Sequence, residues 1–107
     1  MGIFMEQIKD NRIEQCLNDM QKYEKWGNLL MERSLAYIFN SNTPTSELAI
    51  HNGLEYFKAK MKLSVLQDTC HSEEEKDERL KQIDINILHL EETMKQNLKY
   101  RGLLIRP

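Results

Sequence analysis

The 107-residue chain has few residues that break helices or form tight turns, with only four glycines and two prolines. A chain with so few turn-forming residues builds a small number of long elements. It also lacks the uninterrupted apolar run of about 18 residues that a membrane-spanning helix needs. Its first residues lack the basic region and the long apolar stretch of a secretory signal. We therefore expect a cytoplasmic protein that does not bind a membrane.

Motifs that carry catalysis or bind cofactors are also absent. The sequence has no glycine-rich dinucleotide or phosphate-binding loop and no Gly-x-Ser-x-Gly nucleophile elbow. Its histidines and cysteines do not have zinc-ligand spacing, and the Glu-x-x-His pattern of di-iron bundles does not occur. We therefore expect no enzymatic activity, no cofactor and no metal site.

Neither cysteine content nor net charge singles out a function. Cys16 and Cys70 are the only cysteines, and both fall on or beside apolar helical stripes, where a free thiol usually behaves as a small apolar side chain. A disulfide or redox pair is the alternative.

The formal net charge of −2 argues against a surface dominated by attraction to nucleic acid, although it does not exclude a local basic patch.

The clearest positive signal is an apolar stripe near the C-terminal end of the chain. Its members are three and four residues apart, which is the spacing of one helix packing along another. The stripe covers only about two heptads, fewer than a sustained coiled coil needs. We interpret it as one wall of a helical bundle. Its residues are Leu80, Ile83, Ile87, Leu90 and Met94.

Two breaks divide the chain into three predicted helices. The first is at Pro44, which cannot continue a preceding helix but suits the first helical position, with Thr43 as the N-cap. The second precedes Ser72, which forms a capping box with Glu75. The predicted helices cover 3–39, 44–69 and 73–101, followed by Gly102 as a C-terminal cap and an apolar tail over 102–107.

The predicted fold is all-α, a single domain over 1–107. We expect an elongated antiparallel three-helix bundle with coiled-coil-like packing, because short connections favour neighbouring helices of opposite direction. Dimerisation is an open alternative. The second helix has apolar residues on two sides, which predicts that it is central. Inside the first helix, Gly27 and Ser34 let another helix approach closely, or else Trp26-Gly27 marks a kink or break.

Apolar residues in excess of the bundle's needs indicate a protein-binding function. Ile85 and Leu88 lie off the main stripe, and the apolar tail either folds back over the bundle end or docks on a partner. We expect a non-enzymatic interaction protein, such as an adaptor, inhibitor or assembly factor, that forms a homo-oligomer, with a dimer as the expected form. Its small size suits an accessory protein of a phage or mobile element. The predicted interface residues are Trp26, Tyr56, Ile85, Leu88, Leu103 and Leu104.

The alternative function is nucleic-acid binding through lysines. Lys58 and Lys62 share one helix face, and Lys95 and Lys99 gather toward the C-terminus. Such side chains bind phosphate groups in a salt-dependent manner. A simpler interpretation is that they form the solvated face of amphipathic helices.

Overall fold

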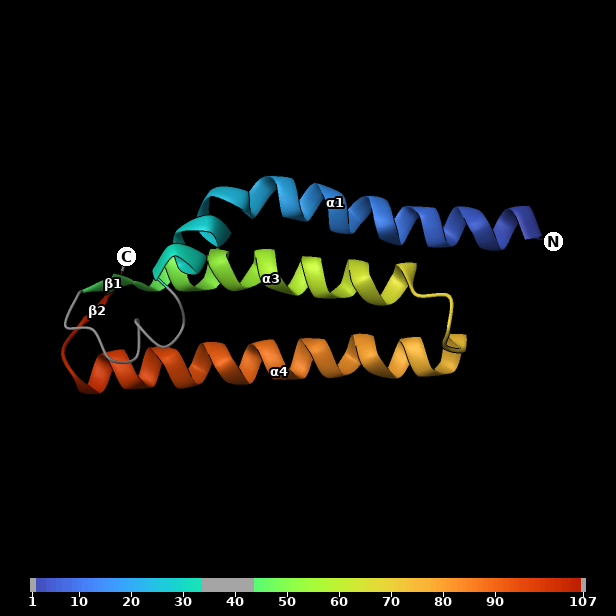
Figure 1. Ribbon diagram of the computed structural model, residues 1–107. Coiled ribbons are helices and arrows are strands. Elements are labelled where there is room, and N and C mark those ends of the chain that lie inside the picture. Colours follow the sequence, from blue (N-terminus) through green and yellow to red (C-terminus); the bar gives the residue numbers. More distant parts are fainter. Residues whose placement is uncertain (1, 34–43, 107) are drawn as a thin grey trace.

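The computed structural model describes the backbone of residues 2–33 and 44–106, and the side chains of residues 11–30 and 44–106. These residues form α1 (Gly2–Arg33), β1 (Thr45–Ser46), α3 (Glu47–Gln67), α4 (Glu73–Tyr100) and β2 (Leu104–Ile105). The protein is a rod of 55 × 23 × 22 Å. Figure 1 shows the chain running in one direction in α1, back in α3 and forward again in α4. The prediction of packed long helices is confirmed.

The central helix is α3, as its two apolar sides predict. It packs against α1 and against α4, and it lies between them in Figure 1. The stripe of α4 faces inward: Ile87 and Met94 are buried, while Leu80, Ile83 and Leu90 are half-buried. The buried cluster at the centre of the protein consists of Leu30, Ile50, Leu54, Ile87, Met94 and Leu98.

Helices α1 and α3 approach each other closely at two glycines. A Cβ atom on Gly27 would lie 2.3 Å from Cδ1 of Tyr56, and one on Gly53 would lie 2.9 Å from Cδ2 of Leu30. The close-approach interpretation is therefore confirmed for Gly27, and Ser34 lies outside the described residues. The helix also bends toward α3 in its C-terminal half (Figure 1) but continues unbroken to Arg33.

The start of α3 differs from the prediction. The helix begins at Glu47, with Ser46 at the N-cap and no side-chain capping bond, so the predicted start at Pro44 is wrong. Thr43 and the predicted helical residues 34–39 lie outside the described residues. Thr45–Ser46 instead pairs in parallel with Leu104–Ile105, and the N–H of Thr45 donates to the carbonyl of Leu103 at 2.8 Å. This pairing between residues far apart in the chain keeps Thr45–Ser46 extended. The predicted all-α fold did not include this pair of strands.

An aspartate ends α3 two residues before the predicted position. The helix ends at Gln67, and the carboxylate of Asp68 accepts a hydrogen bond from the N–H of Cys70 at 2.7 Å. It also contacts Nδ1 of His71. Such an Asx turn competes with continued helix. The hydrogen bond from Cys70 is the main reason that the pKa of Asp68 is lower than usual.

The caps of α4 are those that the sequence predicts. Oγ of Ser72 accepts from the N–H of Glu75 at 3.3 Å. At the other end, Gly102 has φ 71°, and its N–H donates to the carbonyl of Lys99 at 3.0 Å. The N–H of Leu103 donates to the carbonyl of Leu98 at 2.8 Å, which completes a Schellman motif. The turn directs Leu103 and Leu104 back onto the core.

Ser72→Ala is expected to lower the free energy of unfolding by about 1 kcal/mol, because the N–H of Glu75 loses its acceptor. Chemical denaturation monitored by circular dichroism measures this change. Ser64→Ala, at an exposed position inside α3, is the matched control and should not destabilise the protein. Equal stabilities of the wild type and Ser72→Ala would show that the cap contributes nothing.

Candidate partner-binding surface

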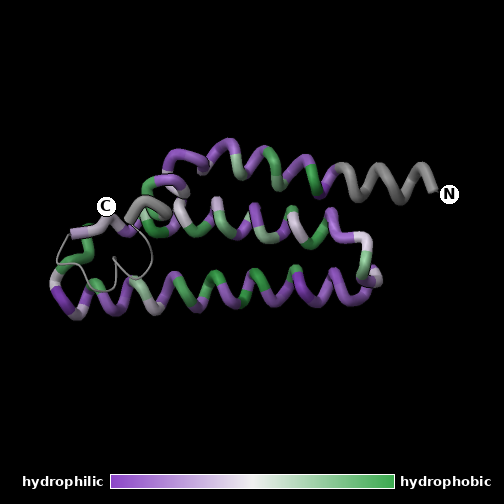
Figure 2. Tube along the Cα trace, in the orientation of Figure 1, coloured by the Kyte–Doolittle hydropathy of each residue, from purple (hydrophilic) through white to green (hydrophobic). Residues whose placement is uncertain are grey.

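The solvent-facing side of α4 carries two large apolar residues one turn apart. Ile85 and Leu88 are 59% and 62% exposed, whereas Ile87 on the opposite side is only 6% exposed. Figure 2 shows hydrophobic stretches alternating with hydrophilic ones along this helix. Because α4 already fills the core with its inward stripe, Ile85 and Leu88 are not needed for that packing.

Charged residues continue this side of α4 in both directions. Counting alternately three and four residues along the helix from Ile85 and Leu88 gives further positions on the same face. All of the charged members are exposed except Lys95, which is half-buried. We call the set the outer face of α4. It consists of Glu74, Glu78, Lys81, Ile85, Leu88, Glu92, Lys95 and Lys99.

Three other predicted interface residues take part in packing of the chain itself. The ring of Tyr56 lies over Gly27 and meets the ring of Phe57 edge-on, with 5.6 Å between the centroids. Leu103 and Leu104 pack against the core. The structure therefore does not gather the six predicted residues into one surface.

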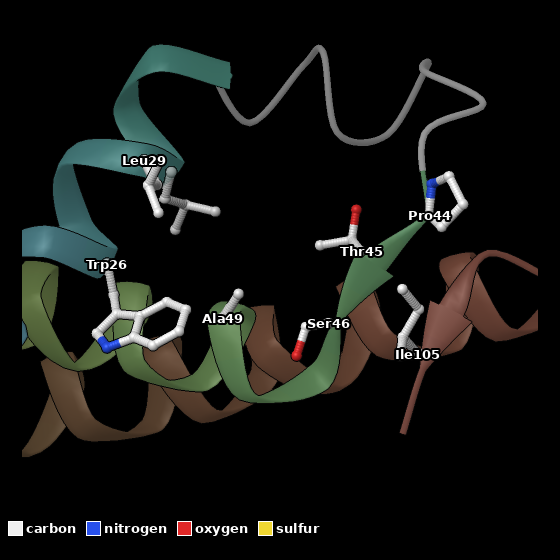
Figure 3. A pocket seen from close by; sticks show the side chains of 8 residues that line it. Trp26, Leu29, Pro44, Thr45, Ser46, Ala49 and Ile105 are labelled. Atoms are coloured by element: carbon white, nitrogen blue, oxygen red, sulfur yellow. The ribbon is translucent and has the colours of Figure 1, made fainter. Parts of the chain in front are cut away.

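Trp26, the sixth predicted residue, lines an apolar hollow between α1 and the start of α3. The hollow has a volume of about 300 Å³. Figure 3 shows Trp26 and Leu29 on one side and Pro44 and Ile105 on the other. Residues 34–43 connect two of these walls and lie outside the described residues, so we assign no ligand to the hollow.

Three of the four lysines proposed for nucleic-acid binding form ion pairs within the chain. Nζ of Lys58 lies 2.8 Å from Oε1 of Glu55, and Nζ of Lys62 lies 2.6 Å from Oδ1 of Asp84. Lys95 is paired as well, as described below, and Lys99 is exposed. Neighbouring carboxylates repel phosphate and compete for the ammonium groups. These contacts do not favour a nucleic-acid interface.

A buried carboxylate joins α3 to α4. Glu91 is 8% exposed; its carboxylate lies 2.8 Å from Nδ1 of His51 and accepts from Nζ of Lys95 at 2.9 Å. Glu47 lies 3.3 Å from the same ammonium group. Burial raises the pKa of Glu91, but the hydrogen bonds from Lys95 and His51 outweigh it and leave the pKa below its usual value. We interpret this network as a structural link.

The two cysteines differ in their surroundings. Both are free thiols, with Cys16 buried and Cys70 exposed. Burial is the main cause that raises the pKa of Cys16, which keeps its thiol protonated and unreactive. The small apolar role predicted for both cysteines therefore fits Cys16 only.

Comparison with known proteins gives no assignment. No protein-family model, curated protein or solved structure matches the chain. Among the side chains of residues 11–30 and 44–106, no three from His, Cys, Asp or Glu come together so that they could hold a metal ion. None of the described helices combines the length and hydropathy that a membrane crossing needs.

Proposed function

We propose that the protein is a non-enzymatic interaction module that binds another protein through the outer face of α4. The observation that supports this proposal is the exposure of Ile85 and Leu88, 59% and 62%, in the middle of a helix whose other side forms the core. Contiguous exposed apolar surface often marks an interface, and these two side chains lie one helical turn apart. Their heptad spacing suits a partner helix that packs in a coiled-coil-like way.

The charged ends of the outer face give this interface its selectivity. Covering Ile85 and Leu88 contributes about 1.5–3 kcal/mol for each fully buried side chain, which is too little for tight binding after the entropy cost of association. The charged residues that flank them select a partner of complementary charge. Such a module serves as an adaptor, inhibitor or assembly factor in the cytoplasm, a role that fits an accessory protein of a phage or mobile element.

Ile85→Ser with Leu88→Ser is expected to weaken partner binding at least about tenfold, since both apolar anchors are lost. The matched control is Leu17→Ser with Leu48→Ser, which removes two leucines that are 49% and 50% exposed on other helices. Binding is measured by quantitative capture from an extract of the source cells and by sedimentation of the purified protein. Unfolding curves check that both variants fold.

Comparing the two double variants tests whether the outer face of α4 is the binding interface. Loss of binding in the α4 variant alone supports the proposal. Equal binding by both variants, or equal loss in both, would exclude the outer face of α4 as the interface.

A further inference from the structure

We infer that the outer face of α4 binds a second copy of the same chain, with the two α4 helices antiparallel about a two-fold axis between Ile85 and Leu88. This inference rests on the proposed function and names its partner. In a two-fold dimer each contact occurs twice. Ile85 faces Leu88 of the partner subunit, and Leu88 faces Ile85 of the partner subunit, so all four exposed apolar side chains meet at the centre.

The charges on the outer face are complementary in this arrangement. Next to the apolar centre, Lys81 faces Glu92 of the partner subunit. Near the ends, Glu74 faces Lys99 of the partner subunit. All of these residues are exposed, so they are available for such pairs. Opposite charges in facing heptad positions are known to set both the orientation and the choice of partner.

The remaining facing pair is also of opposite charge. Glu78 faces Lys95 of the partner subunit. Because Lys95 already has ion pairs with Glu47 and Glu91 at 3.3 and 2.9 Å, we expect this pair to contribute less than the others. Every charged position on the outer face nevertheless meets a charge of opposite sign.

Other arrangements of two α4 helices lose this match. In a parallel pair in register, Lys81 faces Lys81 of the partner subunit and Glu92 faces Glu92 of the partner subunit, which is repulsive. An antiparallel pair shifted by one heptad in either direction places both Ile85 and Leu88 opposite charged residues. The sequence of the outer face therefore selects one direction and one register.

Three residues beside the apolar centre of the outer face do not oppose this pairing. Gln82 and Gln96, on one flank, are uncharged and exposed. Asp84, on the other flank, is paired with Lys62 of its own chain at 2.6 Å. These three residues therefore add no strong repulsion between two copies. The exposed acidic residues Glu75 and Asp77 also flank the outer face, but Asp77 has an ion pair with Arg12 of its own chain at 3.6 Å.

The contact is small, so the dimer should be weak. Each protomer contributes two apolar residues and a row of solvent-exposed charges, and we expect a Kd on the order of 100 μM. Sedimentation equilibrium up to about 1 mM protein, well above that Kd, measures the association.

Charge reversal tests the register. In Lys81→Glu and in Glu92→Lys, two attractive pairs become repulsive, and we expect each variant to dimerise about tenfold more weakly. The combined variant Lys81→Glu with Glu92→Lys restores both pairs, so its Kd should return to within about twofold of the wild type. The single variants change the net charge in opposite directions, so a general effect of net charge cannot weaken both.

Mixing and control experiments complete the test. An equimolar mixture of the two single variants should form heterodimers, because each chain then supplies the charge that the other lacks. Lys60→Glu makes the same charge change at an exposed site on α3 and should leave the Kd unchanged. Circular dichroism checks that the variants fold.

Three results would overturn the inference: a wild type that is monomeric at about 1 mM, a combined variant that dimerises as weakly as the single variants, or single variants that dimerise as tightly as the wild type.

Failure of the dimer inference can be distinguished from failure of the proposed function. A monomer that captures another protein only when Ile85 and Leu88 are intact would contradict the dimer and support the proposed function. A dimer insensitive to both the serine and the charge variants would contradict both.

Discussion

Ile87→Asp is expected to abolish cooperative unfolding. Ile87 is 6% exposed and lies in the cluster that α4 shares with α3. A carboxylate at this position would be buried without a partner, which costs several kcal/mol. That cost is comparable with the whole stability of a domain of this size, about 5–10 kcal/mol. Thermal unfolding followed by circular dichroism should show a broad, non-cooperative change.

Ile85→Asp is the matched control for this experiment. It makes the same substitution two residues away in the same helix, at a site that is 59% exposed. We expect the free energy of unfolding to change by no more than about 0.5 kcal/mol, since the charge stays hydrated. The measurement is made at low protein concentration so that self-association does not contribute. An unchanged melting curve for Ile87→Asp would contradict the burial of the inward stripe.

Gly27→Ala is expected to destabilise the protein by about 2–3 kcal/mol, although alanine is normally the better helix former by about 1 kcal/mol. The added methyl group would lie 2.3, 2.4 and 2.7 Å from Cδ1, Cγ and Cβ of Tyr56. The ring can rotate away, but Cβ is fixed by the backbone of α3, so α1 and α3 must separate locally. Chemical denaturation measures the loss.

A double-mutant cycle tests the cause of this effect. Gly27→Ala should cost less in a Tyr56→Ala background, because two of the three close contacts disappear. The control Asn28→Ala, at the neighbouring exposed position, should raise stability by a few tenths of a kcal/mol. A Gly27→Ala variant as stable as the control would show that the two helices do not approach closely at this point.

Features with local causes are the ones that the sequence predicts well. The N-cap at Ser72 and the left-handed turn at Gly102 depend on residues a few positions apart, and both occur in the structure. The pairing of Thr45–Ser46 with Leu104–Ile105 joins residues far apart in the chain. No local pattern marks those residues as strand partners. The sequence therefore predicted a helix start at Pro44, with Thr43 as its N-cap, whereas α3 begins at Glu47.

The same distinction applies to the candidate surface. Ile85 and Leu88 could be identified because their positions within the helical repeat place them off the inward stripe. Tyr56 carries no comparable signal, since only the register of α1 against α3 places its ring on Gly27. The pairing of Lys62 with Asp84 likewise depends on the register of α3 against α4. Such inter-helix registers are not encoded in the spacing within one helix.

The short strand pair has a consequence for how the protein responds to force and to local opening. The turn at Asp68 joins α3 and α4 at one end, and the pairing of β1 with β2 joins them at the other. The two helices thus form a closed ring, and α1 lies outside that ring and is held to it by packing against α3. Tension on the C-terminal end reaches the strand pair before it reaches the hydrogen bonds of α4. We therefore expect α3 and α4 to open together as one cooperative unit.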